Sequence, residues 1–380
     1  MKIQDINVIP LYWESEKETW NSQFGKEENI HTLVEVIGEG GAFGLGSVYT
    51  SAKLVSAALE LLRPLIIGAS ATDPAAVSEK LHQATFWQGR GGAVTHAISG
   101  IDIGLWDLFG KITNQPISRL LGGRHRETIK PYGSMLMVEP RAMKERLQAG
   151  LARGFKAFKI GWGPFGRQNA RLDEAIVAAA REAVGAGVDL MVDAGGSESF
   201  WPHGFKWAIS AAKMLEQYDV KWFEEALRPD DMEGYIRLTE HSPVPISAGE
   251  VLTRRQSFTE WIDKRAVDYI QPDTTKVGGI SEQHRIGQHA DDHSIMLIPH
   301  GWNTAVGLAA DLQLLAAAGN ARWVEYMTPS PYIEELLVAP PQLDEQGMIR
   351  IPDGPGLGFQ WNLDGIARRS KGASLRSPKR

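Results

Sequence analysis

The chain has 380 residues, of which 43% are hydrophobic, so it is longer than one typical domain and can bury a large core. Its 46 acidic and 40 basic side chains give a formal net charge of -6, which argues against a nucleic-acid-binding surface. The absence of cysteine excludes disulfide bonds and thiolate metal sites. The first residues, MKIQDINVIPLYW, do not have the pattern of a secretory signal, so we expect none, and no apolar stretch reaches the ~20 residues that a membrane-spanning helix requires. We therefore expect a soluble, cytoplasmic protein that binds neither nucleic acid nor membrane.

Residues 1–125 predict an α+β domain. The segments MKIQDINVIPLYW and HTLVEVIGEGG alternate apolar and polar residues, which is typical of antiparallel strands that meet at glycine-rich turns. Helical patterns follow, notably AISGIDIGLWDLFGK, and the segment closes at LLGG.

Residues 126–350 have a different rhythm, in which short apolar runs alternate with helical patterns such as RLDEAIVAAAREAVGAG and SEQHRIGQHADDH. Strands that alternate with helices form right-handed parallel crossovers, and eight of them within about 200 residues predict a closed barrel. The eight runs are residues 130–136, 155–162, 188–195, 220–227, 244–251, 266–273, 294–301 and 323–327.

Residues 351–380 do not continue this pattern. The segment IPDGPGLGF is rich in proline and glycine, and we expect it to return to the first domain. Six lysines and arginines between Arg368 and Arg380 predict a frayed, solvated tail.

Acidic side chains stand at the ends of three neighbouring runs, and the carboxyl ends of barrel strands carry the active site. Asp193 ends the third run, Glu224 and Glu225 the fourth, and Glu250 the fifth. Three converging carboxylates would raise one another's pKa unless a cation lies between them. All-oxygen ligands favour Mg²⁺, with Mn²⁺ next. Because strand side chains alternate in direction, we expect only one of Glu224 and Glu225 in the site.

The sixth and seventh runs end at Asp273 and His300. A carboxylate beside an imidazole fixes its tautomer and raises its basicity, so this pair predicts a general base that faces the metal. The second run carries Lys159 and the eighth carries Glu325, and both are expected at the same end of the barrel.

The whole chain resembles the mandelate racemase and muconate-lactonizing group of the enolase superfamily. The resemblance depends on the order and spacing of SGIDIGLWDLFGK, LLGG, LMVDAGG, WFEEA, SAGE, DYIQPD, KVGGIS, IPHG and IPDGPGLGF. It implies a capping domain, built from both chain ends, over a (β/α)7β barrel. It also implies Asp193, Glu224 and Glu250 as metal ligands and an Asp273–His300 dyad. Glu325 then corresponds to the acid that hydrogen-bonds the substrate carboxylate.

The implied chemistry is removal of the proton α to a carboxylate, with Mg²⁺ stabilising the enediolate. Members that work on both faces of the substrate carry Lys-x-Lys on the second strand, whereas this chain has Lys159 and then Gly161. A single His300 suffices for syn-dehydration, so we expect an acid-sugar dehydratase that forms a 2-keto-3-deoxy acid. A racemase or epimerase, in which Lys159 or a loop residue protonates the far face, an aldarolactone cycloisomerase and a non-catalytic metal-binding barrel stay open as alternatives. Lys159 is expected among the catalytic residues, with pairing to a ligand carboxylate or the substrate carboxylate, without proton transfer, as the alternative. Gly195 stands where many relatives have Asn.

Substrate specificity is expected from loops over the barrel mouth. Candidate contacts are Trp20, Trp87 and Arg90 from the first domain and His203 from the loop after the third strand. Packing between the domains is the alternative for the tryptophans, and a plain surface position is the alternative for His203. Lys276, in a glycine-rich loop, is interpreted as solvent-exposed or loop-supporting. We also expect a symmetric homo-oligomer.

Overall fold

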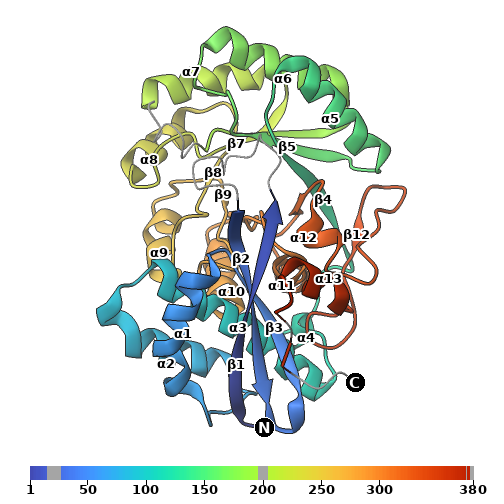
Figure 1. Cartoon of the computed structure of the whole chain (residues 1–380). Helices are drawn as coiled ribbons and strands as arrows, with labels where there is room; N and C mark the ends of the chain where they lie inside the picture. The colour runs from blue at the N-terminus through green and yellow to red at the C-terminus, as the bar shows by residue number, and fades with distance from the viewer. Residues whose placement is uncertain (15–26, 196–203, 374, 377–380) are drawn as a thin grey trace.

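The structure is a computed structural model of the whole chain, and it describes residues 1–14, 27–195, 204–373 and 375–376 (Figure 1). Two of the predicted substrate contacts, Trp20 and His203, lie outside the described residues. None of the helices in the described part of the chain combines the length and the hydrophobicity needed to span a bilayer.

The N-terminal domain is an antiparallel sheet covered by helices. Strand β1 (Ile3–Glu14) pairs with β2 (Glu27–Gly38), which pairs with β3 (Phe43–Val48), so the two strands predicted from alternation are confirmed. The longer helices are α1 (Ala52–Ile66), α2 (Pro74–Thr85) and α3 (Gly92–Thr113). Short helices η2 (Glu39–Gly41), η3 (Phe86–Gln88) and α4 (Ile117–Leu120) complete the domain.

Helix α3 lies directly on strand β3 because glycines face each other across the contact. A Cβ added to Gly46 would lie 1.8 Å from the carbonyl oxygen of Gly100, and one added to Gly44 would lie 2.0 Å from that of Gly104. The glycines in the pattern SGIDIG therefore let the helix backbone approach the sheet more closely than any side chain would permit.

The second domain is the predicted barrel. Its parallel strands neighbour one another in chain order, and β11 returns to pair with β4. A parallel bridge between Leu297 and Ala321 joins the last two strands. The strands are β4 (Thr128–Leu136), β5 (Ala157–Gly161), β6 (Asp189–Asp193), β7 (Val220–Glu224), β8 (Ile246–Ala248), β9 (Tyr269–Ile270), β10 (Met296–Leu297) and β11 (Trp323–Met327).

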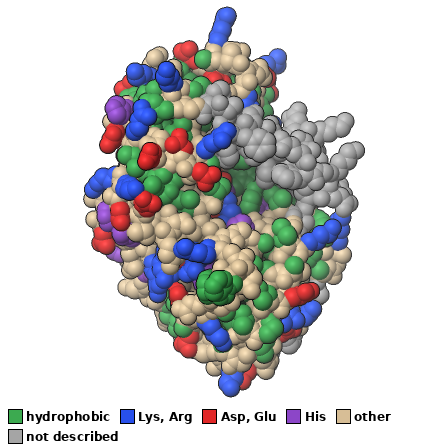
Figure 2. All heavy atoms as spheres, turned by 90° about the vertical axis from the view of Figure 1, so that its left-hand side faces the viewer, with side chains coloured by type: hydrophobic (Ala, Val, Ile, Leu, Met, Phe, Trp, Pro, Cys, Tyr) green, Lys and Arg blue, Asp and Glu red, His purple; other side chains and the backbone are tan. Residues whose placement is uncertain are grey.

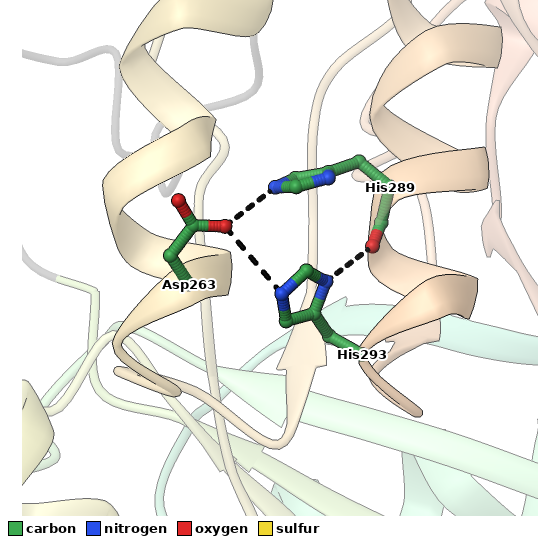
Figure 3. Close-up of side chains that lie close together, drawn as sticks. All are labelled: Asp263, His289 and His293. Atoms are coloured by element: carbon green, nitrogen blue, oxygen red, sulfur yellow. Dashed lines mark hydrogen bonds and ion pairs between the residues drawn. The ribbon is translucent and has the colours of Figure 1, made fainter.

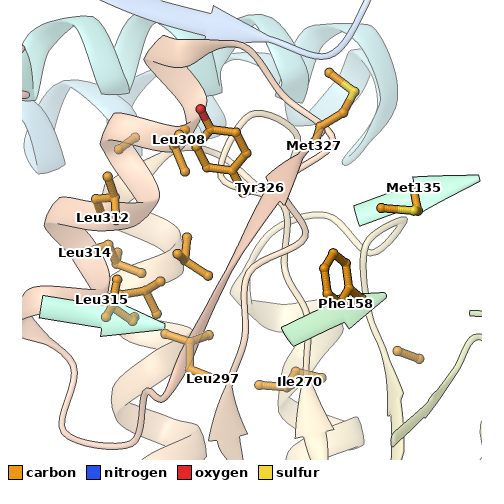
Figure 4. Close-up of a cluster of buried hydrophobic side chains, with 14 of the residues drawn as sticks. Met135, Phe158, Ile270, Leu297, Leu308, Leu312, Leu314, Leu315, Tyr326 and Met327 are labelled. Atoms are coloured by element: carbon orange, nitrogen blue, oxygen red, sulfur yellow. The ribbon is translucent and has the colours of Figure 1, made fainter. Parts of the chain in front are cut away.

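Helices alternate with these strands and form the outer layer, which confirms the (β/α)7β architecture. Apolar side chains from α11 and from several strands pack between the two layers (Figure 4). The helices are α5 (Pro140–Ala152), α6 (Ala170–Val184), α7 (Phe205–Glu216), α8 (Met232–His241), α9 (Arg255–Asp263), α10 (Ile280–Asp292) and α11 (Ala305–Ala317).

The inside of the barrel is filled by a separate apolar cluster that contains one residue from most strands. It consists of Tyr132, Ala157, Met191, Trp222, Ile298 and Trp323, all buried. This layer is a floor, and the next inward-facing residue on each strand lies above it.

The C-terminal segment contains helix α12 (Pro331–Glu334), strand β12 (Ile349–Arg350), which pairs antiparallel with β4, and helix α13 (Leu363–Arg369), which packs against β1. Within IPDGPGLGF, the backbone N–H of Leu357 donates to Asp107 of α3 (2.9 Å). The domain limits at residues 125 and 350 stay predictions.

The expectation of a frayed tail from Arg368 is wrong for the described residues up to Arg376. Arg369 lies in α13, where its guanidinium donates two hydrogen bonds to Glu335. The backbone N–H of Arg376 donates to Glu35 (2.9 Å), and its side chain pairs with Asp5 (3.1 Å). Carboxylates of other segments therefore hold the basic residues in place.

Helix α3 also docks the capping domain on the barrel. Asp102 accepts hydrogen bonds from both the backbone N–H (2.9 Å) and the hydroxyl (2.5 Å) of Ser281, and the Trp106 indole donates to the same hydroxyl (2.9 Å). The hydroxyl of Ser99 accepts from the N–H of Gly278 (2.8 Å). The sequence patterns SGIDIGLW and KVGGIS thus meet at the interface between the domains.

Candidate active site

The predicted site residues lie one step above the apolar floor of the barrel. Lys159, Asp193, Glu224, His300 and Glu325 each follow a floor residue by two positions. Side chains along a strand repeat their direction every second residue, so these groups face the barrel axis at the carboxyl ends of the strands. All five are buried.

Asp193, Glu224 and Glu250 come from the ends of β6, β7 and β8 and expose 4%, 1% and 8% of their surface. Burial, followed by the nearby Glu224 carboxylate, raises the pKa of Asp193 well above its usual range, although Lys159 opposes the effect. The backbone N–H of Gly195 donates to Asp193 Oδ1 (2.7 Å), which orients that carboxylate. The three carboxylates thus lie at the ends of neighbouring strands in a dry environment.

Lys159 Nζ is surrounded by carboxylates. It lies 2.5 Å from Glu224 Oε1, 3.0 Å from Glu325 Oε1 and 3.7 Å from Asp193 Oδ2. Burial would lower the pKa of this amine, but the Glu224 and Glu325 carboxylates raise it well above its usual range. Lys159 is therefore a fixed cation in this arrangement, not a base with a free electron pair.

Glu224 is further held by two donors that sequence reasoning did not single out. Trp222 Nε1 and Gln271 Nε2 each donate to Glu224 Oε2 at 2.9 Å. Gln271 stands two residues before Asp273, so its position in the strand pattern is the signal that could have identified it.

Asp273 and His300 form the predicted dyad at the ends of β9 and β10. His300 Nδ1 lies 2.8 Å from Asp273 Oδ2, and His300 Nε2 lies 3.2 Å from Glu250 Oε2. Asp273 Oδ1 accepts hydrogen bonds from the N–H (2.7 Å) and hydroxyl (2.6 Å) of Thr275. Burial would lower the pKa of His300, but Glu250 and the hydrogen bond with Asp273 raise it to about 9. The carboxylate fixes the ring so that Nε2 points toward Glu250.

Glu325 lies between Lys159 and the His300 loop. Its Oε2 accepts a hydrogen bond from the N–H of Gly301 (2.7 Å). Burial would raise the pKa of Glu325, but Lys159 and then His300 lower it to about 2. In this arrangement Glu325 is an ionised hydrogen-bond acceptor.

Glu225 corrects the expectation that only one acid of the pair joins the site. Strand β7 ends at Glu224, and Glu225 has a φ of 47°, so the alternation of the strand no longer applies. Burial, Glu250 and Asp193 raise the pKa of Glu225 well above its usual range. A Cβ on Gly195 would lie 2.9 Å from both Asp193 Oδ1 and Glu225 Oε2, so Glu225 borders the space beside Gly195.

Lys276 corrects the expectation of a solvent-exposed loop residue, because only 7% of it is accessible. Its Nζ lies 3.5 Å from Asp273 Oδ2 and 3.9 Å from Glu250 Oε1, and 4.8 Å from the ring centroid of Tyr49. Tyr49 also makes an edge contact with the His300 ring (6.4 Å between centroids). The site thus contains a second buried cation, which the capping domain covers.

Gly161 occupies the position of the second lysine of Lys-x-Lys. A Cβ there would lie 2.6 Å from Cβ and 3.1 Å from Oδ2 of Asp193 on the adjacent strand. The barrel has no room for a side chain at this position.

Trp87 lies in η3, between α2 and α3, and Arg90 lies in the loop that follows. Trp87 is 84% exposed, so the alternative of packing between the domains is wrong for this residue. The backbone carbonyl of Arg90 accepts a hydrogen bond from Thr253 (3.2 Å), three residues after Glu250. Figure 2 shows a recess on one face of the molecule, with hydrophobic, basic and histidine side chains at its floor.

The donor set matches what a hard divalent cation requires. Asp193, Glu224 and Glu250 supply only oxygens, and they come from adjacent strands. Lys159 Nζ and His300 Nε2 lie within 3.2 Å of two of these carboxylates and partly balance their charge. Burial, and then repulsion from neighbouring carboxylates, raises the pKa values of Asp193 and Glu225, which indicates a place for added positive charge.

Comparison with known proteins agrees with this geometry. Residues 142–365 match the family described as enolase C-terminal domain-like, and residues 22–122 match the N-terminal domain of mandelate racemase and muconate lactonizing enzyme. The chain belongs to the enolase superfamily. Membership confirms the resemblance drawn from the motifs and identifies the protein as an enzyme of the mandelate racemase group.

Relatives within the superfamily differ in reaction. The chain is 31% identical to a D-galactarolactone cycloisomerase of Agrobacterium fabrum, over 90% of this chain and 91% of the relative. It is 30% identical to a D-xylonate dehydratase of Haloferax volcanii, over 88% and 84% of the two chains. A racemase from Streptomyces coelicolor with bound magnesium has a TM-score of 0.85 at 26% identity, over 97% of this chain and 99% of that one.

Proposed function

We propose that the protein is a Mg²⁺-dependent acid-sugar dehydratase that forms a 2-keto-3-deoxy acid. His300 Nε2 takes the proton from the carbon next to the carboxylate, and the electron pair of that C–H bond forms a double bond to the β-carbon. The β C–O bond breaks, and the hydroxyl leaves as water with the proton that His300 returns. The resulting enol becomes the 2-keto product.

The orientation of His300 is the observation that carries the proposal. Asp273 holds Nδ1 at 2.8 Å, which leaves Nε2 directed toward Glu250, 3.2 Å from its Oε2. Thr275 in turn holds Asp273 through two hydrogen bonds. A base fixed in this way can serve first as acceptor and then as donor without turning.

Asp193, Glu224 and Glu250 are the proposed ligands of Mg²⁺, with Mn²⁺ as an alternative. When bound, the cation would stabilise the negative charge that develops on the substrate carboxylate as the proton leaves. Trp222 and Gln271 donate hydrogen bonds to Glu224 and so orient its carboxylate.

Lys159 and Glu325 are proposed to position the substrate carboxylate. Lys159 is a buried cation that already contacts carboxylates at 2.5 and 3.0 Å, so it can hold an anionic substrate without transferring a proton. Glu325 is fixed by the N–H of Gly301 (2.7 Å), and it is proposed to take up a proton when the substrate binds and to donate a hydrogen bond to the substrate carboxylate.

Dehydration is favoured over racemisation because glycine at position 161 has no side chain that could act as a base on the second face. A racemase must protonate the face opposite the one that lost the proton, whereas syn-dehydration needs only His300. A cycloisomerase acting on an aldarolactone is the second candidate, since the chain is 31% identical to a D-galactarolactone cycloisomerase. Trp87 and Arg90 are proposed to contact the sugar hydroxyls when substrate fills the site.

A library of acid sugars, incubated with the protein and Mg²⁺ in D₂O, tests the proposal. A dehydratase yields a 2-keto product that semicarbazide detects. An epimerase instead incorporates deuterium without loss of water, and a cycloisomerase changes a lactone without forming a ketone. If the best substrate gives either of those two results, the proposed dehydration is wrong and the protein catalyses the other reaction.

His300→Asn is the matching variant. We expect turnover to fall by about 10²–10⁴-fold, because the acid–base group is lost, while Mn²⁺ binding stays intact because no proposed ligand changes. His241→Asn, on the surface of α8, is the control and should keep full activity. Normal turnover by His300→Asn would exclude the proposed base.

A further inference from the structure

A second group of metal-ligating side chains lies outside the barrel, between helices α9 and α10. Asp263 is the last residue of α9, His289 lies in the last turn of α10, and His293 caps that helix. Figure 3 shows both imidazoles directed at the Asp263 carboxylate. Their nearest ligand atoms all lie within 4.8 Å of one another.

The two histidines are four residues apart, so they project from the same face of the helix. Their rings make an edge contact with centroids 4.6 Å apart. His289 Nε2 lies 2.8 Å from Asp263 Oδ1, and His293 Nε2 lies 3.5 Å from the same oxygen. Two nitrogens and one oxygen thus converge from two helices.

A hydrogen bond to its own helix orients the His293 ring. Its Nδ1 lies 2.9 Å from the backbone carbonyl of His289, and a carbonyl only accepts, so Nδ1 carries the proton. Nε2 then faces Asp263, 3.5 Å from its Oδ1. Either a proton on Nε2 or a metal ion between the two atoms makes this contact favourable. A backbone hydrogen bond at the other ring nitrogen is also the usual second contact of a metal-bound histidine.

We propose that Asp263, His289 and His293 bind a divalent transition metal ion such as Zn²⁺. Tetrahedral bonds of 2.0–2.2 Å place neighbouring ligand atoms roughly 3.3–3.5 Å apart. The 3.5 Å pair has this spacing, and the 2.8 Å pair has to open by only about half an ångström. Water completes the coordination. Imidazole ligands select such an ion over Mg²⁺, which prefers oxygen.

The surroundings leave this cluster accessible. The side chains of His289, His293 and Asp263 are 35%, 31% and 49% exposed, so an ion can enter from solvent. The adjacent cation, Lys264, pairs with Glu260 (2.5 Å) and does not occupy the Asp263 carboxylate. A bound ion would link α9 to α10 and would stabilise the folded chain in proportion to its occupancy.

Zinc binding to the intact protein, measured by calorimetry and thermal unfolding at saturating Mg²⁺, tests the inference. The variants are His289→Gln, His293→Gln and Asp263→Asn. The control is His241→Gln, since His241 on α8 makes the same Nδ1 contact to a carbonyl four residues earlier (2.8 Å). Zinc that binds inside the barrel does so equally in the parent, the three variants and the control. It therefore does not affect the differences in zinc affinity between these five proteins.

We expect the parent and the control to bind one zinc ion with a rise in Tm. Each cluster variant should bind that ion at least about tenfold more weakly. A circular dichroism spectrum and a zinc-free Tm equal to those of the parent show that a variant is folded. If a histidine variant does not fold, Asp263→Asn, which keeps both imidazoles, still tests the site. Equal zinc affinity in all proteins, or no zinc-dependent rise in Tm in the parent, would mean a histidine–aspartate hydrogen bond only and would overturn the inference.

Discussion

At the scale of single residues, Gly161 limits which reactions the barrel can support. A Cβ at this position would lie 2.6 Å from Cβ of Asp193, so even alanine must displace the neighbouring strand or the acid. We expect Gly161→Ala to lower the free energy of unfolding by about 1–3 kcal/mol and to weaken divalent-metal binding. Gly187→Ala, where an added Cβ meets nothing within 4 Å, is the control. Denaturant unfolding and Mn²⁺ titration measure both effects, and wild-type values for Gly161→Ala would contradict the steric argument.

Lys276 is the residue whose role the structure changes most. Its cation opposes protonation of His300, so it lowers the pKa of that imidazole. Removing the charge raises the pKa of His300, which keeps the base protonated to higher pH. We therefore expect Lys276→Met to move the acidic limb of the rate–pH profile to higher pH, whereas Lys276→Arg, which keeps the charge, moves it much less. An acidic limb that stays in place in Lys276→Met would show that Lys276 only supports its loop.

At the scale of elements, the contact between α3 and β3 depends on glycine. A Cβ on Gly46 would lie 1.8 Å from the carbonyl oxygen of Gly100, and backbone atoms cannot turn aside as a flexible side chain can. We expect Gly46→Ala to cost about 1–3 kcal/mol of unfolding free energy or more. Chemical denaturation checks the effect against Gly204→Ala, whose added Cβ meets nothing within 4 Å. Equal stability of the two variants would contradict the close approach.

Hydrophobic periodicity predicts the barrel strands and the direction of most of their side chains. All eight predicted runs contain a barrel strand, because apolar runs between helical patterns leave few other arrangements. The alternation rule then places Asp193, Glu224 and His300 above the apolar floor. The same rule fails at Glu225, because β7 has already ended and the backbone turns to a φ of 47°. Periodicity predicts direction only inside a strand.

At the scale of the whole molecule, the interface between cap and barrel contains two buried histidines and one half-buried histidine. His31 on β2, His82 on α2 and His96 on α3 come from the capping domain. Burial lowers their pKa values from 6.5 to about 3, 3 and 4. Arg254 lowers the pKa of His82 further, and Lys276 acts in the same direction on His31 and His96. The folded state therefore keeps these rings neutral beside the cations of the barrel.

This arrangement predicts an acid-labile interface. Between the unfolded pKa near 6.5 and the lower folded pKa, the unfolded chain binds more protons, so stability falls as the pH decreases from about 7 toward 4. For His82 the loss is on the order of a few kcal/mol. His82→Phe cannot take up a proton and should flatten the decline, whereas His241→Phe on the surface should not. Equal slopes of unfolding free energy against pH for both variants would show that His82 does not contribute.

The barrel, its strands and the acids and histidine at the strand ends could be predicted from the residues alone, because they follow from local periodicity and from the rule that barrel sites lie at the carboxyl ends of strands. The surroundings of these residues could not be predicted, because they depend on how distant segments pack. Lys276 stands in a glycine-rich loop that reads as exposed, yet Tyr49 of the capping domain covers it. The Asp263–His289 contact joins residues 26 positions apart on neighbouring helices. Such contacts depend on how separate segments pack, which no local pattern of residues encodes.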